Sequence, residues 1–219
     1  MEAPRSRRDE YSEATRQALL DSAARLFADK GFAATSLDEV AADARVTKGA
    51  VYHHFTNKQA LFEAVADQAE VDACAAIMAA AAEAGDPWSG AIAGLDAFLE
   101  RCLDPVYQRL CFQEGPAVLG FAAWWEHGEK HEIGLIRAML AGLHAQGLVD
   151  SDDLDTLTQL LFGSMAAIAL ALARADDPKA ASLSARQAII RLVAGLRPAG
   201  VPLPPIDAPP AGVGPAGGA

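Results

Sequence analysis

Apolar residues recur at helical spacing along most of this sequence, and no run of strand length alternates apolar and polar residues. The 49 alanines among 219 residues strengthen this pattern, because alanine is the strongest helix former. With 52% hydrophobic and 21% charged residues, the chain is too apolar for a disordered protein and can bury a sizeable core. The sequence therefore predicts an all-α fold.

The first sixty residues carry the start and stop signals of several short helices. A helix over residues 13–30 ends at Gly31, and Ser36 opens a second helix, with a glutamate three positions later as in a capping box. Thr47 caps a third helix of about two turns, and Asn57 caps a long fourth helix. Two short helices joined by a tight turn, with a helix before them, predict an N-terminal three-helix helix-turn-helix domain.

The chain divides further by composition. We expect the helix-turn-helix domain to cover residues 13–60 and a C-terminal helical bundle to cover residues 61–197. Residues 1–12 are expected to form a disordered arm, and residues 198–219, rich in Pro, Gly and Ala with one charge, a disordered tail. Gly, Pro and Asp bound the expected bundle helices, which cover residues 88–103, 105–113, 116 or 121–146, 154–175 and 178–196.

Charge is distributed unevenly. Residues 1–60 hold nine basic and nine acidic residues, so the net charge of −11 belongs to the remainder, and a local basic face in the first part can still meet phosphates. Three cysteines without a CxxC spacing and the lack of an apolar leader favour the cytoplasm. The uncharged residues 156–173 are near membrane length, but their polar members favour a buried bundle or dimer helix, and we expect no membrane partner.

The expected third helix has the side chains of a recognition helix for the major groove of DNA. A lysine in its first turn can reach base edges, small residues allow close approach, and hydroxyl, imidazole and ammonium groups can meet phosphates. The second helix can offer hydroxyls at its start, and the fourth a lysine at its start. The candidate DNA-binding residues are Thr35, Ser36, Thr47, Lys48, Gly49, Tyr52, His53, His54 and Lys58.

The same segment carries a motif series. Residues 31–65 read GFAATSLDEVAADARVTKGAVYHHFTNKQALFEAV. The first helix ends in Phe-x-x-x-Gly-Phe, which starts at Phe27, and the segment continues with Thr-Ser, Lys-Gly-x-x-Tyr-x-x-Phe and Asn-Lys-x-x-Leu. This pattern closely resembles the N-terminal domain of TetR/AcrR-family transcriptional regulators. With the first helix, the resemblance covers about a quarter of the chain, and the helical remainder has the length that the family implies.

The resemblance implies a homodimer whose two recognition helices enter successive major grooves of a near-palindromic operator. It also implies a C-terminal domain that binds a small effector. In the family, the lysine-glycine-tyrosine face and the following Asn-Lys touch DNA, which here are Lys48, Gly49 and Tyr52, with His53, His54 and Lys58 beside them.

Aromatic residues concentrate where an effector cavity would be expected. Seven of the fourteen aromatic residues lie between residues 88 and 125, and we expect them to line an apolar pocket, although core packing explains them equally well. The ligand would be largely apolar with one or two polar groups. The candidate pocket residues are Trp88, Phe98, Cys102, Phe112, Glu114, Phe121, Trp124, His127 and His131.

Two histidines on one predicted helix, His127 and His131, have the four-residue spacing of metal ligands. The segment lacks the HExxH order of a zincin, and a solvated helix face explains it better. We therefore expect no metal and no cofactor. Nor does the sequence pair a nucleophile with a base or follow a strand with a glycine-rich loop, so we expect no catalytic residues and no enzyme.

Dimerisation needs an apolar surface, which the last two helices can supply as half of a four-helix bundle. The candidate interface residues are Leu161, Met165, Ile168, Ile189, Leu192 and Val193. The expected function is that of a ligand-responsive dimeric repressor, released from its operator by a largely apolar small molecule. Two alternatives stay open: a dimeric regulator without an effector, or an α-helical metal-binding enzyme that uses His127 and His131.

Overall fold

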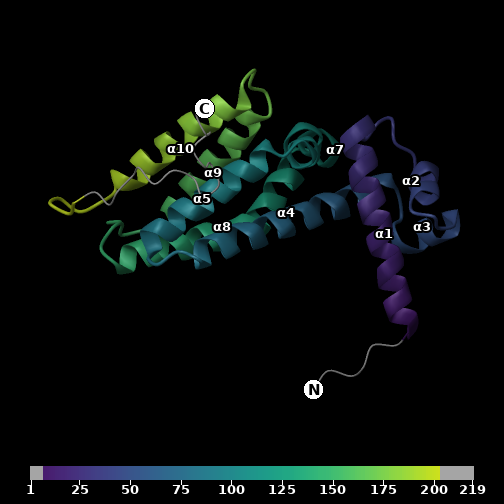
Figure 1. Cartoon of the computed structure of the whole chain (residues 1–219), viewed down its shortest axis with the longest axis horizontal. Helices are drawn as coiled ribbons and strands as arrows, with labels where there is room; N and C mark the ends of the chain where they lie inside the picture. Colours follow the sequence, from purple (N-terminus) through teal and green to yellow (C-terminus); the bar gives the residue numbers. More distant parts are fainter. Residues whose placement is uncertain (1–6, 203–219) are drawn as a thin grey trace, which may run out of the picture. The chain divides into compact units, whose positions relative to one another are not determined.

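The computed structural model describes residues 7–202 (Figure 1). Every regular element in that range is a helix, which confirms the all-α prediction. The first half of the expected N-terminal arm and residues 203–219 of the expected tail lie outside the described residues.

The chain forms two compact units. Unit 1 comprises Met1–Asp72 and Asp104–Gly128, and unit 2 comprises Ala73–Leu103 and Glu129–Ala219. This division differs from the domain boundary expected after residue 60, because residues 104–128 pack with the N-terminal helices. Two long helices, α4(Lys58–Ala82) and α8(Phe121–Ala145), contribute residues to both units.

Unit 1 begins with α1(Arg7–Lys30), α2(Leu37–Asp43) and α3(Lys48–His54). The helix α1 starts earlier than residue 13, so the described part of the expected arm is helical from its first residue. All three helices contact one another, and they enclose a core of large apolar side chains that α4 completes. Buried members of that core are Leu19, Phe27, Val40, Val51, Leu61 and Phe62.

The caps of these helices follow the sequence signals. Ser36 accepts a hydrogen bond from the Glu39 amide, Thr47 accepts one from the Ala50 amide, and Asn57 accepts one from the Ala60 amide. Each satisfies an amide that the first turn of a helix leaves without a partner.

Residues 105–119 complete unit 1 with α6(Pro105–Tyr107), the π-helix η1(Gln108–Glu114) and α7(Gly115–Leu119). The expected single helix over 105–113 is therefore wound more widely over most of its length. The indole Nε1 of Trp124 donates to the carbonyl of Cys111 over 2.7 Å, which satisfies an acceptor inside the π-helix. Buried Tyr107 donates its hydroxyl to Glu70 over 2.8 Å and fixes α6 on α4.

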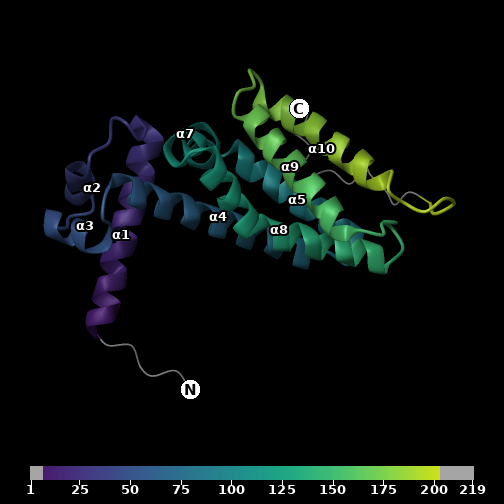
Figure 2. The same cartoon turned by 180° about the vertical axis from the view of Figure 1, so that it is seen from behind.

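Unit 2 is built from α5(Pro87–Leu103), α9(Leu154–Leu172) and α10(Pro178–Ala194), with parts of α4 and α8. The helices α5, α9 and α10 lie side by side in both views (Figures 1 and 2). A largely buried ion pair joins two of them, since the Arg186 guanidinium donates to Asp96 over 2.5 and 3.1 Å. Aspartates cap the starts of α9 and α10 as the expected boundaries require.

The helix α9 is long and apolar enough, by length and composition alone, to cross a membrane. Core helices of soluble proteins pass the same test, and a third of its most apolar window is buried in unit 2.

Candidate nucleic-acid interface and apolar cavity

The helix α3 turns almost all of its side chains away from the core of unit 1. Of its residues, Val51 alone is buried, while Lys48, Gly49 and His53 are exposed and Tyr52 is 51% exposed. The cap at Thr47 fixes where this helix begins, so these exposed positions share one accessible surface. A short helix that presents lysine, glycine and tyrosine outward has the form of a recognition helix.

Lys48 is held by a carboxylate of the neighbouring helix α2. Its ammonium nitrogen lies 2.8 and 2.9 Å from the two carboxylate oxygens of Asp38. This hydrogen bond and the negative charge of Asp38 raise the pKa of Lys48. Both side chains are more than half exposed, so the pair can open towards an incoming ligand.

The two histidines at the end of α3 lie against each other, with ring centroids 5.1 Å apart. Partial burial, together with the neighbouring His53, lowers the pKa of His54. His54 is therefore largely neutral at pH 7 and offers a hydrogen bond rather than a positive charge.

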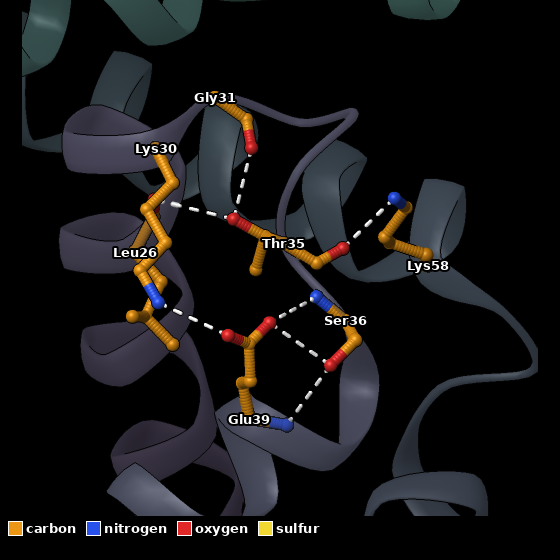
Figure 3. A network of polar contacts seen from close by, with 7 residues as sticks. All are labelled: Leu26, Lys30, Gly31, Thr35, Ser36, Glu39 and Lys58. Carbon is orange, nitrogen blue, oxygen red and sulfur yellow. Dashed lines mark hydrogen bonds and ion pairs between the residues drawn. The ribbon is translucent and has the colours of Figure 1, made fainter.

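The turn between α1 and α2 is closed by a polar network (Figure 3). Thr35 is buried, and its hydroxyl donates to the carbonyls of Gly31 and Leu26 over 2.9 and 3.2 Å. The Lys58 ammonium group donates to the carbonyls of Phe32, Thr35 and Ala33 over 2.7, 2.8 and 3.3 Å. The structure thus buries the hydroxyl of Thr35 and directs the ammonium group of half-buried Lys58 onto backbone carbonyls, although both were expected to meet phosphates.

The lower half of the same network is the capping box of α2 (Figure 3). The carboxylate of Glu39 accepts from the Ser36 amide, the Ser36 hydroxyl and the Lys30 ammonium group over 2.9 to 3.0 Å. These donors, the Lys30 contact foremost, lower the pKa of Glu39 to about 2. Ser36 itself is exposed, so it can cap the helix and still lie at the protein surface.

The π-helix binds the end of α1 through an arginine and a glutamate, a contact that we call the α1 clamp (Arg109 and Glu114). Glu114 accepts from the backbone amide of Phe32, and Arg109 donates to the carbonyls of Ala28 and Asp29 over 3.1 and 3.4 Å. The two clamp side chains also bond each other over 3.3 Å. The ends of both side chains lie against Gly31. Glu114, expected in an effector pocket, therefore holds the helix-turn-helix instead.

Other expected pocket residues also pack within unit 1. The rings of Phe112 and Trp124 form an edge-to-face chain with Tyr107, and all three are buried. Phe121 is 62% exposed, and His127 lies in the same unit. None of these residues lines the described cavity of unit 2.

That cavity lies between the helices of unit 2 and has a volume of about 110 Å³. Trp88 and Phe98 line it as expected, whereas Cys102 is buried outside it and His131 offers its carbonyl to Cys74. Four residues expected at the dimer interface also line it, namely Leu161, Met165, Ile189 and Val193. The other two expected interface residues, Ile168 and Leu192, do not line the cavity, and Leu192 is 50% exposed.

Sequence reasoning missed the wall that α8 contributes. Its lining residues recur at helical spacing, which is the signal that could have identified them: Glu132, Leu135, Ile136, Met139, Leu140 and Leu143. The aromatic residues between 88 and 125 gave no sign of this aliphatic stripe.

Comparison with known proteins agrees with this geometry. The family model described as bacterial regulatory proteins, tetR family, matches residues 19–65, and the model described as tetracyclin repressor-like, C-terminal domain, matches residues 88–196. A solved TetR-family transcriptional regulator from Pectobacterium atrosepticum is 33% identical, with a TM-score of 0.77, over 88% of this chain and 98% of that one. The chain belongs to the TetR family.

Other TetR-family relatives match over different lengths. The Transposon Tn10 TetC protein of Escherichia coli is 29% identical over 76% of this chain and 84% of its own length. The regulator AcrR of Shigella flexneri is 48% identical over 26% of each chain, a length close to that of the helix-turn-helix. RolR, solved with resorcinol, shares the fold at a TM-score of 0.64 and 23% identity, over 90% of this chain and 99% of that one.

Membership of the TetR family identifies the chain as a DNA-binding transcriptional repressor and not an enzyme. The helix-turn-helix of unit 1 supplies the DNA-binding element, and the predicted resemblance and absence of enzymatic function are confirmed.

Proposed function

We propose that this TetR-family protein is a cytoplasmic homodimer that represses transcription at a near-palindromic operator and is released by a small apolar effector. The observation that carries the DNA-binding part is the exposed face of α3, with Lys48, Gly49 and Tyr52 outward and Val51 inward. Two copies of such a face read half-sites one helical turn apart, about 34 to 36 Å.

An exposed apolar surface on α9 and α10 supports the dimer. Leu160, Leu183 and Leu192 are each at least half exposed, although leucine is usually buried. Pairing these helices with those of a second copy in a four-helix bundle would cover exposed apolar side chains on both.

The cavity of unit 2 supports the effector response. A fully packed interior would favour a regulator without an effector. Unit 2 instead contains a cavity, and its walls are almost wholly apolar. The fold neighbour RolR was solved with resorcinol, so this fold can hold a single-ring molecule. An effector releases DNA only if it binds better to a dimer conformation in which the spacing of the two recognition helices does not match the half-sites. The difference between its affinities for the two conformations sets how much operator binding is weakened.

The test is binding of the purified protein to the DNA that flanks its own gene, at two salt concentrations. We expect specific, salt-sensitive binding, which a Lys48→Ala and Tyr52→Ala double variant loses by about tenfold or more. Lys179→Ala removes an exposed lysine of α10 as the matched control and should bind as the wild type. If neither flanking DNA nor a random-sequence selection yields a specific site, the proposal is wrong.

A further inference from the structure

The α1 clamp joins the end of α1 to the π-helix of unit 1. We propose that its two members, Arg109 and Glu114, are positioning residues for operator recognition. They hold the helix-turn-helix in an orientation in which both copies of a dimer reach their half-sites together. This inference rests on the proposed dimeric binding to a near-palindromic operator and adds the residues on which its geometry depends.

Arg109 closes the C-terminal end of α1. The last carbonyls of a helix have no partner within the helix, and those of Ala28 and Asp29 accept from the Arg109 guanidinium over 3.1 and 3.4 Å. The positive charge of the guanidinium also lies at the negative end of the helix dipole. Since α1 ends at Lys30, the arginine acts where the chain turns towards α2 and the recognition helix.

Glu114 holds the start of the turn between α1 and α2. Its carboxylate accepts from the backbone amide of Phe32, whose carbonyl accepts from Lys58 of α4 over 2.7 Å. The Phe32 ring packs against those of Phe27 and Phe62, with centroids 5.8 and 5.4 Å away. The position of the turn therefore depends on two elements that are distant in sequence, α4 and η1.

The clamp side chains are largely shielded from water. The Arg109 side chain is 34% exposed and that of Glu114 is 21% exposed, whereas Lys48 and Asp38 of the recognition surface are 61% and 64% exposed. Partly buried polar contacts are electrostatically stronger than exposed ones, which water screens. The α1 clamp is therefore suited to fix a geometry, and the Lys48 pair to open towards a ligand.

The winding of η1 brings the two clamp residues together. Arg109 and Glu114 are five positions apart, and in an α-helix such residues lie about 140° apart around the axis. The i→i+5 hydrogen bonds of a π-helix instead place residues five apart on the same side. The indole of Trp124 donates to the Cys111 carbonyl within η1 and supports this winding. The pair can therefore meet on α1 only while η1 keeps its π winding.

The test compares binding to two duplexes. One is the specific site found in the test of the proposed function, and the other is the same duplex with one half-site replaced by unrelated sequence. A wild-type dimer should prefer the full site by about a hundredfold, because its second contact is intramolecular. Glu114→Ala should lower this preference about tenfold and leave half-site affinity within about twofold of the wild type. An unfolded fraction would reduce binding to both duplexes equally, so the ratio of the two affinities reports orientation and not stability.

Three further variants show whether the bonds of the clamp set the preference. Glu114→Gln keeps an acceptor for the Phe32 amide and should restore most of the preference that Glu114→Ala loses. Trp124→Phe removes the indole donor to η1 but leaves Arg109 and Glu114 in place, and should also lower the preference. Glu126→Ala removes an exposed glutamate of α8 within unit 1 as the matched control and should behave as the wild type.

The outcomes separate this inference from the proposed function. An unchanged preference in Glu114→Ala, even with both affinities reduced, would overturn the inference and leave the proposed function intact. A preference lowered as far in Glu126→Ala as in Glu114→Ala would also overturn it. A wild type that binds both duplexes equally would contradict the dimeric operator of the proposed function, and the inference with it.

Discussion

The ammonium group of Lys58 lies on three backbone carbonyls of the turn between α1 and α2, and this predicts a structural effect of its removal. Lys58→Met should lower the free energy of unfolding by about 1.5–3 kcal/mol, the range for hydrogen bonds to a charged group. Urea unfolding measures this change. Lys30→Met is the control: it removes an exposed ion pair of the same network and should cost less.

The salt dependence of operator binding separates this role from contact with DNA. A lysine that meets a phosphate adds about 0.9 to the slope of log K against log salt. The slope of Lys58→Met should equal that of the wild type. A slope smaller by about one would show that Lys58 leaves its carbonyls and binds phosphate.

The lowered pKa of Glu39 predicts that the protein loses stability in acid. The Lys30 contact and the two donors of Ser36 lower its pKa from 4.5 to about 2, so the folded state prefers the ionised carboxylate. A carboxyl group whose pKa is lower in the folded state than in the unfolded state stabilises the fold at pH values above its unfolded-state pKa. This contribution is lost as the pH falls through its folded-state pKa. Between pH 4.5 and about 2, the wild type should therefore lose more stability than Glu39→Gln, as urea unfolding at several pH values can measure. Equal pH profiles would contradict the capping role of the charge.

How well single residues could be predicted depended on where their partners lie. The caps Ser36, Thr47 and Asn57 were predictable because each acts on an amide three residues away. Lys58 was not, because its partner carbonyls become available only when the turn between α1 and α2 folds against α4. Thr35 was not, because its hydroxyl bonds to carbonyls at the end of α1, which a sequence pattern does not distinguish from a phosphate. A hydroxyl or ammonium group next to a recognition helix has the same sequence signal in either role.

The α1 clamp lies against a glycine at the end of α1. Gly31 has φ +86°, and a Cβ added there would lie 2.6 Å from a Glu114 oxygen and 2.8 Å from an Arg109 nitrogen. Gly31→Ala should therefore cost about 1–2 kcal/mol for the left-handed conformation, and more because the clamp must move. Thermal or urea unfolding provides the measurement.

A double-mutant cycle separates the two costs. In a Glu114→Ala background the steric part is relieved, so Gly31→Ala should destabilise less than it does in the wild type. Glu114→Gln should retain part of the lost stability, because its amide oxygen can still accept from the Phe32 amide. Strictly additive effects would mean that the clamp does not press on Gly31.

Helix type and cavity position were harder to predict than helix boundaries. The boundaries of α5, α8, α9 and α10 followed Gly, Pro and Asp, whose effects are local. The π-helix depends on tertiary partners such as Trp124. Tertiary packing also decides that Phe112 and Trp124 belong to unit 1, whereas Trp88 lines the cavity of unit 2. Periodicity showed which helix faces are apolar but not which of them face a cavity, so Leu161 and Ile189 were expected at the dimer surface.

The proposed dimer depends on surface that one chain leaves open. Leu192 is half exposed on α10, and Leu192→Arg would bring an unpaired charge into an apolar interface, at a cost of about 3–5 kcal/mol. Sedimentation at micromolar concentration should show a species of about 22.9 kDa for this variant and twice that mass for the wild type. Val71→Arg, at an exposed position of α4, is the control and should stay dimeric. A wild type that sediments only as a monomer would refute the dimer.

The contact between Lys48 and Asp38 affects how a repressor searches a genome. A genome offers about 10⁶–10⁹ decoy sites, each of which attracts a bare cation through its phosphates alone. Asp38 neutralises the most prominent cation of α3 until a competing partner replaces it. Random sequence supplies phosphates and mismatched base edges, whereas an operator supplies base edges in the arrangement that repays the exchange. If Lys48 contacts the operator as proposed, the carboxylate would weaken binding to decoys more than binding to the target, and less of the protein would be held elsewhere on the chromosome.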